Sequence, residues 1–321
     1  MADIVVMGAG AVGSVLGGFL AQAGHTVTLL GRPAHMRAIA ERGLAITGLF
    51  GHHWIRGLEV VTDPAALPRG AAAVWVCVKS YDTASVASWA EHCRAPRGVV
   101  ISAQNGLGNL ELLASTVPPT ALLGARVIFG ARLVRPGEVE VTVSAEPVRI
   151  GAFVRGAQEA ERQARHWAEA LAAAGLDCQW TPDIHAELWA KVFYNAALNP
   201  LGALLGCHYG ALAEHDDTRA LMDQVIAEAF AVARAEGVAL PWSSAEEYLE
   251  RFYSQLVPAT YGHRSSMLQD LERGKPTEIE AINGALWRRA TQHGLAAPAN
   301  ELLTRLLRVR SALARKEEGR R

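Results

Sequence analysis

The first half of the chain alternates short apolar runs with helical patterns. Continuous apolar runs separated by helices are typical of parallel strands that are covered on both faces. Two later segments, GEVEVTV and PVRIGAF, instead alternate apolar with polar residues, and Pro136-Gly137 is a turn signal. We therefore expect these two segments to form antiparallel strands that close one edge of the sheet. The apolar runs lie at 4–7, 26–30, 74–78 and 99–103, and helical stretches at 11–23 and 157–175.

The strand signal ends near Pro182, and only helical patterns follow. Within 217–236 an apolar stripe recurs at helical spacing, and Gly237 follows as a stop signal. The pattern predicts an α/β Rossmann-type dinucleotide-binding domain over 1–181, followed by an all-helical domain over 182–321. The helices are expected at 185–206, 217–236, 244–257, 266–273, 277–293 and 298–316.

Composition and charge narrow the class of protein. The 321 residues carry a formal net charge of −1, so no global charge favours nucleic acid. The stretch 4–31 lacks Asp, Glu, Lys and Arg, which could mimic a membrane span. It is, however, rich in glycine, contains His25, and follows no basic segment. A strand, a glycine turn and a buried helix explain it better than a signal peptide or an anchor.

The cysteines argue against a metal or redox site. No two of the four form a Cys-x-x-Cys pair, so neither a zinc knuckle nor a redox dithiol is indicated. A reducing cytoplasm is the default compartment for such a chain, and we expect no metal. The cysteines are Cys77, Cys93, Cys178 and Cys207.

A glycine fingerprint follows the first predicted strand. Its glycines would provide the tight turn, the close approach to a pyrophosphate and the helix–strand packing. Backbone N–H groups at the start of the helix would hold the phosphates. Because the fingerprint lies between two predicted strands, it predicts dinucleotide binding rather than a glycine-rich packing turn. The candidate cofactor-binding residues here are Gly8, Gly10, Ala11, Val12 and Gly13.

The end of the second strand bears on the choice of cofactor. NAD-binding domains usually have an acidic residue there, whereas this chain has Leu30-Gly31-Arg32. An arginine suits a 2′-phosphate, so Arg32 favours NADP over NAD. The alternatives are NAD as the cofactor, and a surface role for Arg32.

Two loops follow strands at the edge where ligands bind in open α/β sheets. One begins at Lys79 and the other contains Asn105, and either could line the nicotinamide side. Taken alone, Lys79 is equally consistent with a solvated lysine, and Asn105-Gly106 with a simple turn.

A helix in the second half carries the strongest candidates for chemistry. Lys191, Asn195 and Asn199 lie at i, i+4 and i+8, so they share one face of a helix that is otherwise apolar. A buried lysine needs a partner or a function, although its stem could also extend to solvent. Asn199-Pro200 is expected to disturb the helix at that point.

Polar groups also stand at two predicted helix starts. Ser266 and Gln269 have capping-box spacing, and so do Thr277 and Glu280. Glu278 has no part in this second capping box. Ser266 could be only a cap, or could also attract a substrate carboxylate at the helix N-terminus.

Five segments together resemble the ketopantoate reductase (2-dehydropantoate 2-reductase) family, in order from Ile4 to about Gly284. The last two are much more specific than the glycine fingerprint. The resemblance implies a Rossmann domain, a helical domain and a site between them. The segments are GAGAVGSVLGGFLAQAGHTVTLLGR, VKSYDT, QNGLGN, KVFYNAALNPLGAL and SSMLQDLERGKPTEIEAING.

The resemblance also implies roles for individual residues. Lys191 matches the general acid that protonates the carbonyl oxygen as hydride arrives from NADPH. Glu278 matches a glutamate that binds substrate and helps to position the lysine. Arg32 would contact the 2′-phosphate. Lys79 and Asn105 match positions near the nicotinamide and the reacting carbonyl, and the substrate-binding positions are Asn195, Asn199 and Ser266.

The implied reaction is NADPH-dependent reduction of ketopantoate to pantoate, as in pantothenate biosynthesis. The chain has His263 where the family pattern has an asparagine that contacts substrate, and it lacks a His-x-Gly-type turn in 139–151. These departures leave open a related reductase of another 2-oxo acid or carbonyl. A third alternative is a non-catalytic NADP-binding sensor, although Lys191 with Glu278 argues against it. The expected partner is a small 2-oxo acid, and a homodimer is left open.

Overall fold

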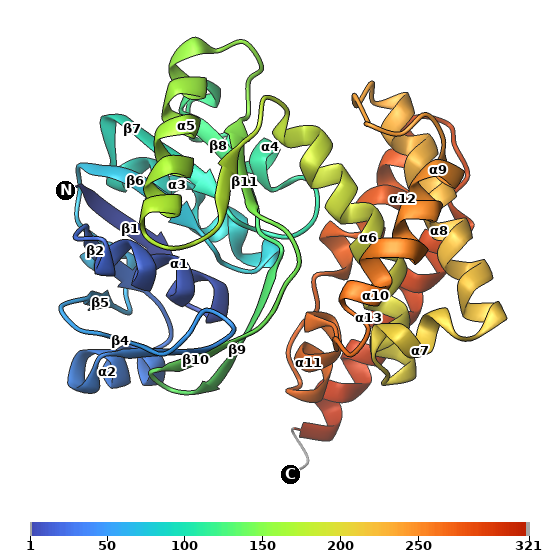
Figure 1. Ribbon diagram of the computed structural model, residues 1–321, viewed down its shortest axis with the longest axis horizontal. Coiled ribbons are helices and arrows are strands. Elements are labelled where there is room, and N and C mark those ends of the chain that lie inside the picture. Colours follow the sequence, from blue (N-terminus) through green and yellow to red (C-terminus); the bar gives the residue numbers. More distant parts are fainter. Residues whose placement is uncertain (1, 319–321) are drawn as a thin grey trace. The chain divides into compact units, whose positions relative to one another are not determined.

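The structure, a computed structural model, describes residues 2–318 and divides into two compact units (Figure 1). The first unit runs to Gln104 and resumes over Asn109–Ile184. The second contains the chain from His185 onward and also the short loop Asn105–Gly108. Within residues 2–318, no helix combines the length and the apolar composition that crossing a membrane requires.

The first unit is built on an eight-stranded sheet in the order β12-β11-β8-β7-β6-β1-β2-β5. The six strands from β8 to β5 are parallel, and β11 pairs antiparallel with β8. This confirms the expected α/β class and the antiparallel pairing of PVRIGAF, but β12 and not this segment forms the edge of the sheet. The strands are β1 (Asp3–Met7), β2 (Thr26–Leu30), β5 (Glu59–Val61), β6 (Ala71–Val76), β7 (Arg94–Ser102), β8 (Leu122–Arg126), β11 (Val148–Ala152) and β12 (Cys178–Trp180).

Side chains from successive strand positions enter two different cores, one on each face of this sheet. Val6 and Trp75 pack with α1 and α5, whereas Val5 and Val74 pack with α3 and α4. A sheet buried on both faces explains the continuous apolar runs in the sequence. The helices of this unit are α1 (Ala11–Gln22), α2 (Pro33–Arg42), α3 (Thr83–Cys93), α4 (Asn109–Leu113) and α5 (Gln158–Ala173).

A second, four-stranded sheet in the order β4-β3-β10-β9 packs on α1. The GEVEVTV segment forms β10 in this sheet, so its predicted place at the edge of the main sheet is wrong. Gly18 of α1 allows the approach, because a Cβ there would lie 2.8 Å from both Ile46 Cδ1 and Ile55 Cδ1. The strands are β3 (Leu44–Gly48), β4 (His53–Ile55), β9 (Phe129–Arg135) and β10 (Glu138–Ser144).

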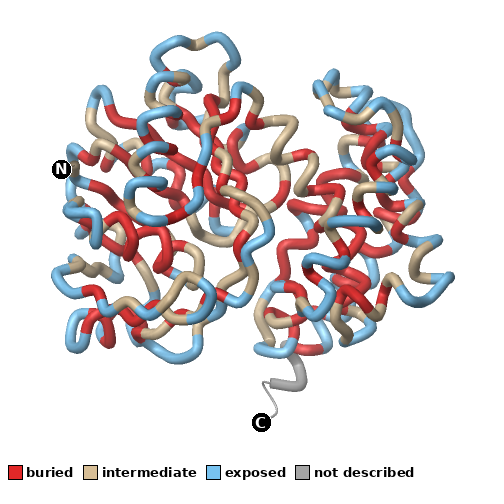
Figure 2. Tube along the Cα trace, in the orientation of Figure 1, coloured by how far each residue is buried: buried red, intermediate tan, exposed pale blue. Residues whose placement is uncertain are grey.

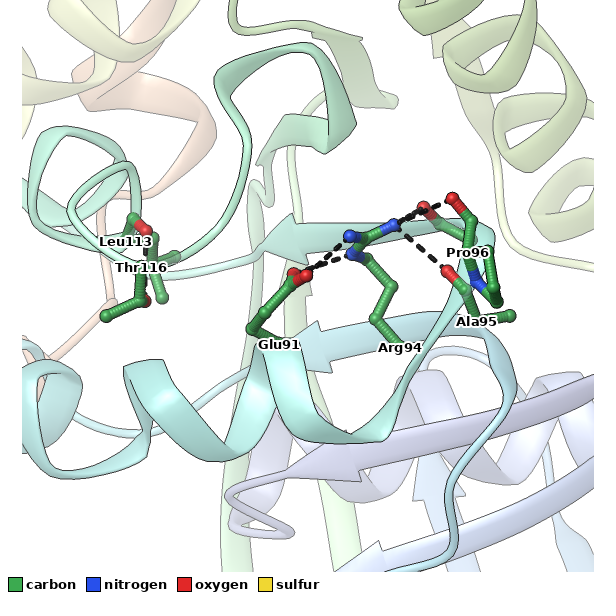
Figure 3. Close-up of polar contacts among 7 residues, drawn as sticks. Glu91, Arg94, Ala95, Pro96, Leu113 and Thr116 are labelled. Atoms are coloured by element: carbon green, nitrogen blue, oxygen red, sulfur yellow. Dashed lines mark hydrogen bonds and ion pairs between the residues drawn. The ribbon is translucent and has the colours of Figure 1, made fainter.

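Arg94 stabilises the sharp passage from α3 into β7 (Figure 3). Its guanidinium forms an ion pair of 2.6 Å with Glu91, one turn earlier in the helix. The same group donates to the carbonyls of Ala95 at 2.9 Å and Gly98 at 3.1 Å. One planar fork therefore pairs with a carboxylate of the helix and satisfies carbonyls at the irregular start of the strand.

The second unit is helical, with a core separate from those of the sheet (Figure 2). Its helices are α6 (Ile184–Leu205), α7 (Tyr209–Ala213), α8 (Asp216–Ala235), α9 (Ala245–Arg251), α10 (Val257–Ala259), α11 (Ser266–Glu272), α12 (Asn283–Gln292) and α13 (Pro298–Glu318). A π-helical turn over Phe252–Leu256 joins α9 to α10.

Two sequence-based expectations for these helices are wrong. The helix expected over 277–293 is interrupted, with a 3₁₀ turn at Ile279–Ala281 before α12 begins. Conversely, α6 continues through Pro200 without a break. Pro200 has no N–H to offer the carbonyl of Ala196, but the side-chain amide of Asn283 donates to that oxygen instead.

Candidate functional site

The glycine turn after β1 has little room for side chains. Gly8 has φ +97°, and a Cβ there would lie 2.5 Å from the backbone N of Val78. A Cβ on Gly13 would lie 2.4 Å from the Gly8 carbonyl oxygen. These two positions therefore require glycine for the tight turn and for helix–strand packing, as the fingerprint predicts.

Gly10 is different, because open space lies around it. The nearest atom to a Cβ at this N-cap position is 4.0 Å away, and α1 has no acidic residue in its first turn. The first N–H of α1 with a backbone acceptor is that of Ser14, which donates to Gly10. The N–H groups of Ala11, Val12 and Gly13 find no acceptor in residues 2–318. This chemistry fits the pyrophosphate of a dinucleotide.

Arg32 and Lys79 lie at strand ends on the same sheet. Arg32 is exposed and is the N-cap residue of α2, and Lys79 is the half-buried N-cap residue of a 3₁₀ turn that ends at Asp82. Burial raises the pKa of Asp82, and the positive charge of Arg32 opposes that rise. Arg32 therefore provides a positive charge after the end of β2, where the sequence predicts that the adenosine ribose of the cofactor binds.

The loop after β7 is fixed by buried polar contacts at one end. Gln104 donates to the hydroxyl of Thr83 at 2.7 Å and to the carbonyl of Val78 at 3.0 Å. Asn105–Gly108 then leaves this unit and joins the helical one. Gly106 has φ +85°, and a Cβ on it would lie 2.3 Å from the carbonyl oxygen of Ala281. Glycine at this position thus allows the loop to lie directly against the segment after Glu278.

Asn105 connects the lysine and the glutamate that the sequence singles out. Lys191 Nζ donates to Asn105 Oδ1 at 2.6 Å, and Asn105 Nδ2 donates to Glu278 Oε2 at 3.4 Å. Glu278 is only 6% exposed, whereas Lys191 is half-buried. The three side chains form a polar cluster in the helical unit, with an ammonium group that can transfer a proton to a bound acceptor.

Asn195 and Asn199 follow Lys191 along the same face of α6. Asn195 is 7% exposed, and its side-chain amide has no hydrogen-bond partner within residues 2–318. Asn199 is 4% exposed, and its Oδ1 accepts a hydrogen bond of 2.6 Å from the hydroxyl of Tyr209. A buried amide without a protein partner is costly unless a ligand or water bonds to it. The stripe therefore has the features of a binding surface.

Ser265, rather than Ser266, is the N-cap of α11. The Oγ of Ser265 accepts from the N–H of Leu268 at 3.0 Å and donates to the carbonyl of Asn199 at 3.3 Å. Gln269 bonds to the carbonyl of Arg264 instead of completing a capping box. The capping role predicted for Ser266 is thus wrong, and its exposed hydroxyl is left for other contacts.

The second predicted capping box is also wrong. The hydroxyl of Thr277 is buried and has no partner in the part of the chain that the structure describes, and the 3₁₀ turn starts after Glu278. Glu280 forms ion pairs with Arg308 and Arg288, and these hydrogen bonds and charges hold the pKa of its carboxyl below the usual range. Glu280 therefore forms tertiary ion pairs instead of the capping contact that the box predicts.

Sequence reasoning missed Tyr209 and could not place His263. The ring of His263 packs edge-on against that of Tyr209, with centroids 5.1 Å apart. Burial lowers the pKa of His263. No local pattern marks Tyr209, because its link to Asn199 depends on the packing of α7 against α6. Within residues 2–318, no group of three His, Cys, Asp or Glu side chains is arranged to hold a metal.

A doubly wound sheet with a dinucleotide-type glycine turn, together with a helical unit that presents a lysine among amides, defines a dinucleotide-dependent oxidoreductase. Two family models match the chain. Ketopantoate reductase PanE/ApbA covers residues 4–155, and its C-terminal counterpart covers residues 183–311. The chain belongs to the ketopantoate reductase family. It is an oxidoreductase that acts on a C=O/CH–OH couple.

Named relatives and solved structures agree with this assignment. The 2-dehydropantoate 2-reductase of Aquifex aeolicus is 34% identical over 306 residues, covering 95% of this chain and 96% of the relative. That of Halobacterium salinarum is 36% identical over 308 residues, with 95% and 98% covered.

A ketopantoate reductase structure from Ralstonia eutropha JMP134 has TM-score 0.85 and 35% identity, covering 97% of this chain and 99% of that one. The structure of D-mandelate dehydrogenase with NADH and anilino(oxo)acetate has TM-score 0.88 and 25% identity, with the same coverage.

Proposed function

We propose that the protein reduces 2-dehydropantoate to pantoate with NADPH, with Lys191 as the general acid. The observation that carries this proposal is the cluster of Lys191, Asn105 and Glu278, next to the amide of Asn195, which has no partner among the described residues 2–318. The family models and the named relatives support the same reaction. Pantoate formation would place the enzyme in pantothenate biosynthesis.

The proposed roles follow from the chemistry of each group. Gly8, Gly10, Ala11, Val12 and Gly13 would hold the cofactor phosphates. The cofactor supplies a hydride, which forms the new C–H bond at C2 of the 2-oxo acid. The carbonyl oxygen takes the electron pair of the broken π bond.

Proton transfer to that oxygen is assigned to Lys191. An ammonium group carries a proton that it can transfer, and its charge stabilises the developing alkoxide. Asn105 accepts from the ammonium and so fixes its position, while Glu278 orients Asn105. Asn195, Asn199 and Ser266 are proposed to bind the substrate, and Lys79 to lie on the nicotinamide side.

Arg32 supports NADPH as the preferred cofactor, since no acidic residue ends β2 and an exposed guanidinium follows it. NADH is the runner-up, because it is bound in the D-mandelate dehydrogenase structures.

A second candidate substrate class is an aromatic 2-oxo acid. His263 presents a flat, partly buried ring beside Tyr209, and the D-mandelate dehydrogenase structure contains anilino(oxo)acetate. A flat ring in contact with the substrate would favour an aromatic substituent over one that carries a hydroxyl group.

Initial rates of NADPH and NADH oxidation test both candidates. The panel contains ketopantoate, 2-oxoisovalerate, oxaloacetate, pyruvate and phenylglyoxylate. A kcat/KM for ketopantoate far above the others is the expected result. A preference for phenylglyoxylate would assign the second candidate, and no turnover of any acid would overturn the proposed reaction.

A homodimer and a cytoplasmic location complete the proposal. Four side chains of α13 at coiled-coil spacing are between 44 and 59% exposed, and such a stripe can pair with its own copy about a two-fold axis. All four cysteines are free thiols, which suits a reducing compartment. The stripe consists of Leu302, Leu306, Val309 and Leu313.

A further inference from the structure

Tyr209 fixes which end of the Asn199 side chain is available. Its phenol O–H donates to Oδ1 at 2.6 Å, and both residues are buried. The oxygen of the carboxamide is therefore occupied. The nitrogen of the same carboxamide has no acceptor within residues 2–318, so its N–H groups are free to bond to a ligand.

A backbone hydrogen bond and two ring contacts fix the position of Tyr209. Its backbone N–H donates to the carbonyl of His263 at 3.1 Å. The rings of Tyr194 and His263 pack edge-on against it, with centroid separations of 5.8 and 5.1 Å. Burial raises the pKa of Tyr209 well above its ordinary value, so the phenol stays protonated at neutral pH.

We propose that Tyr209 is a positioning residue that turns the N–H groups of Asn199 toward the substrate carboxylate, and so selects a 2-oxo acid over the corresponding amide. This inference rests on the proposed function, because it takes the α6 stripe as the substrate-binding surface. Asn195, one turn earlier on the same face, has a side-chain amide without a hydrogen-bond partner in residues 2–318.

The chemistry explains why orientation matters. A carboxylate has only acceptors, so it gains from an amide nitrogen and is repelled by an amide oxygen. A primary amide replaces one of the two carboxylate oxygens with an NH₂ group, which has no acceptor to offer to the N–H groups of Asn199 and would need the asparagine oxygen instead. Without the phenol O–H, the carboxamide of Asn199 can rotate by half a turn, and the penalty against an amide ligand disappears.

The test uses 2-oxoisovalerate and 2-oxoisovaleramide, which differ only at the group in question. Their dissociation constants are measured by calorimetry on the full chain with oxidised cofactor, so that no turnover is needed. We expect Tyr209→Phe to lower the preference for the acid by about ten- to a hundredfold, as for one hydrogen bond to a charged group. A change of less than twofold would overturn the proposal.

Tyr194→Phe is the matched control. It removes a phenol from the same cluster, but that hydroxyl bonds to Thr260 and not to Asn199. The acid-to-amide ratio should stay as in the unmodified protein, and an equal fall in both variants would show a merely structural effect and contradict the proposal.

Two variants of Asn199 complete the design. In an Asn199→Ala background, Tyr209→Phe should not change the ratio any further, and independent effects would contradict the proposal. Asn199→Asp keeps an acceptor for the phenol but replaces the N–H groups with an anionic oxygen. It should lose binding of the acid and keep that of the amide, which tests the orientation even where Tyr209→Phe fails to fold.

Failure of the proposed function is a separate result. An enzyme that turns over no 2-oxo acid, but still prefers the acid over the amide in binding, would overturn the reaction and leave the role of Tyr209 intact. If the unmodified protein binds both probes equally, the role of Tyr209 is overturned even when turnover is observed.

Discussion

Asn283 replaces the hydrogen bond that Pro200 cannot make. Its Nδ2 lies 3.0 Å from the carbonyl oxygen of Ala196, and the same nitrogen donates to Asn300 Oδ1 at 3.0 Å. Asn300 in turn donates to Glu228 at 2.8 Å. A buried network thus ties α6 to α12, α13 and α8, and it allows a proline within the helix that carries Lys191.

We predict that Asn283→Ala destabilises the helical unit by about 1–3 kcal/mol, because it leaves a buried carbonyl without a donor. Denaturant unfolding followed by circular dichroism measures the loss. Pro200→Ala restores a backbone N–H at that carbonyl, so Asn283→Ala should cost less in the Pro200→Ala background. Equal costs in both backgrounds would contradict this explanation of the continuous helix.

Replacing Lys191 should remove the proton donor without removing the fold. Lys191→Ala is expected to lower kcat by roughly 10²- to 10⁴-fold, the usual contribution of general acid catalysis. Lys191→Gln keeps a donor of similar length but cannot release a proton, so it should be nearly as slow. Stopped-flow measurement of NADPH oxidation gives the rate, and a near-normal kcat in Lys191→Gln would exclude the assignment.

Arg32→Ala should separate the two nicotinamide cofactors. Losing a charge-assisted contact with the 2′-phosphate should raise the KM for NADPH by about ten- to a hundredfold, while the KM for NADH changes little. Both constants come from initial rates at a saturating level of the preferred 2-oxo acid. An equal change in both would mean that Arg32 does not contact the phosphate.

His35 predicts a loss of stability on mild acidification. Its Nδ1 accepts from the N–H of Gly137 at 2.9 Å, so the neutral ring carries its proton on Nε2, 3.0 Å from Ser14 Oγ. Burial lowers the pKa of His35 from 6.5. The unfolded chain therefore takes up a proton first as the pH falls.

The contribution of the neutral His35 ring to the free energy of unfolding is complete above pH 6.5. It is lost as the pH falls from 6.5 toward the lower pKa of His35 in the folded state. The slope is at most about 1.4 kcal/mol per pH unit for this one group. Unfolding free energies at pH 7.5, 6.5 and 5.5 should show a smaller slope for His35→Gln than for the unmodified protein. Identical slopes would rule out His35 as a source.

The apolar stripe on α13 predicts a homodimer that a single charged residue within the stripe would dissociate. Light scattering should give the mass of two 34.3 kDa chains for the unmodified protein and of one for Leu306→Glu. Leu205→Glu is the control, since Leu205 is 58% exposed but lies at the end of α6. The prediction fails if the unmodified chain is a monomer, or if both variants dissociate alike.

Periodicity in the sequence predicted the buried parallel strands and most helices, because those patterns reflect local burial. It could not separate β10 from the main sheet, since alternation shows that one face of a strand is covered but not by what. The capping boxes failed for a similar reason. Ser265 and Ser266 have almost the same local signal, and tertiary contacts with Asn199 select the first.

In the candidate site, too, local patterns could be predicted from the sequence but tertiary contacts could not. Spacing alone brought Lys191, Asn195 and Asn199 to one helix face, where the structure also has them. The contact of Lys191 with Asn105 joins residues 86 positions apart, and no period in the sequence encodes it. Tyr209 was missed because an isolated tyrosine has no pattern to recognise.

The loop Asn105–Gly108 sets a limit on how this chain can be divided. It lies between two strands of the sheet in the sequence, yet it belongs by contact to the helical unit. A fragment that begins at His185 would contain Lys191 and Glu278 but not the amide that bonds to both. The helical half is therefore not a self-sufficient module for transplantation or gene fusion, because one of its polar groups is encoded some eighty residues before its first helix.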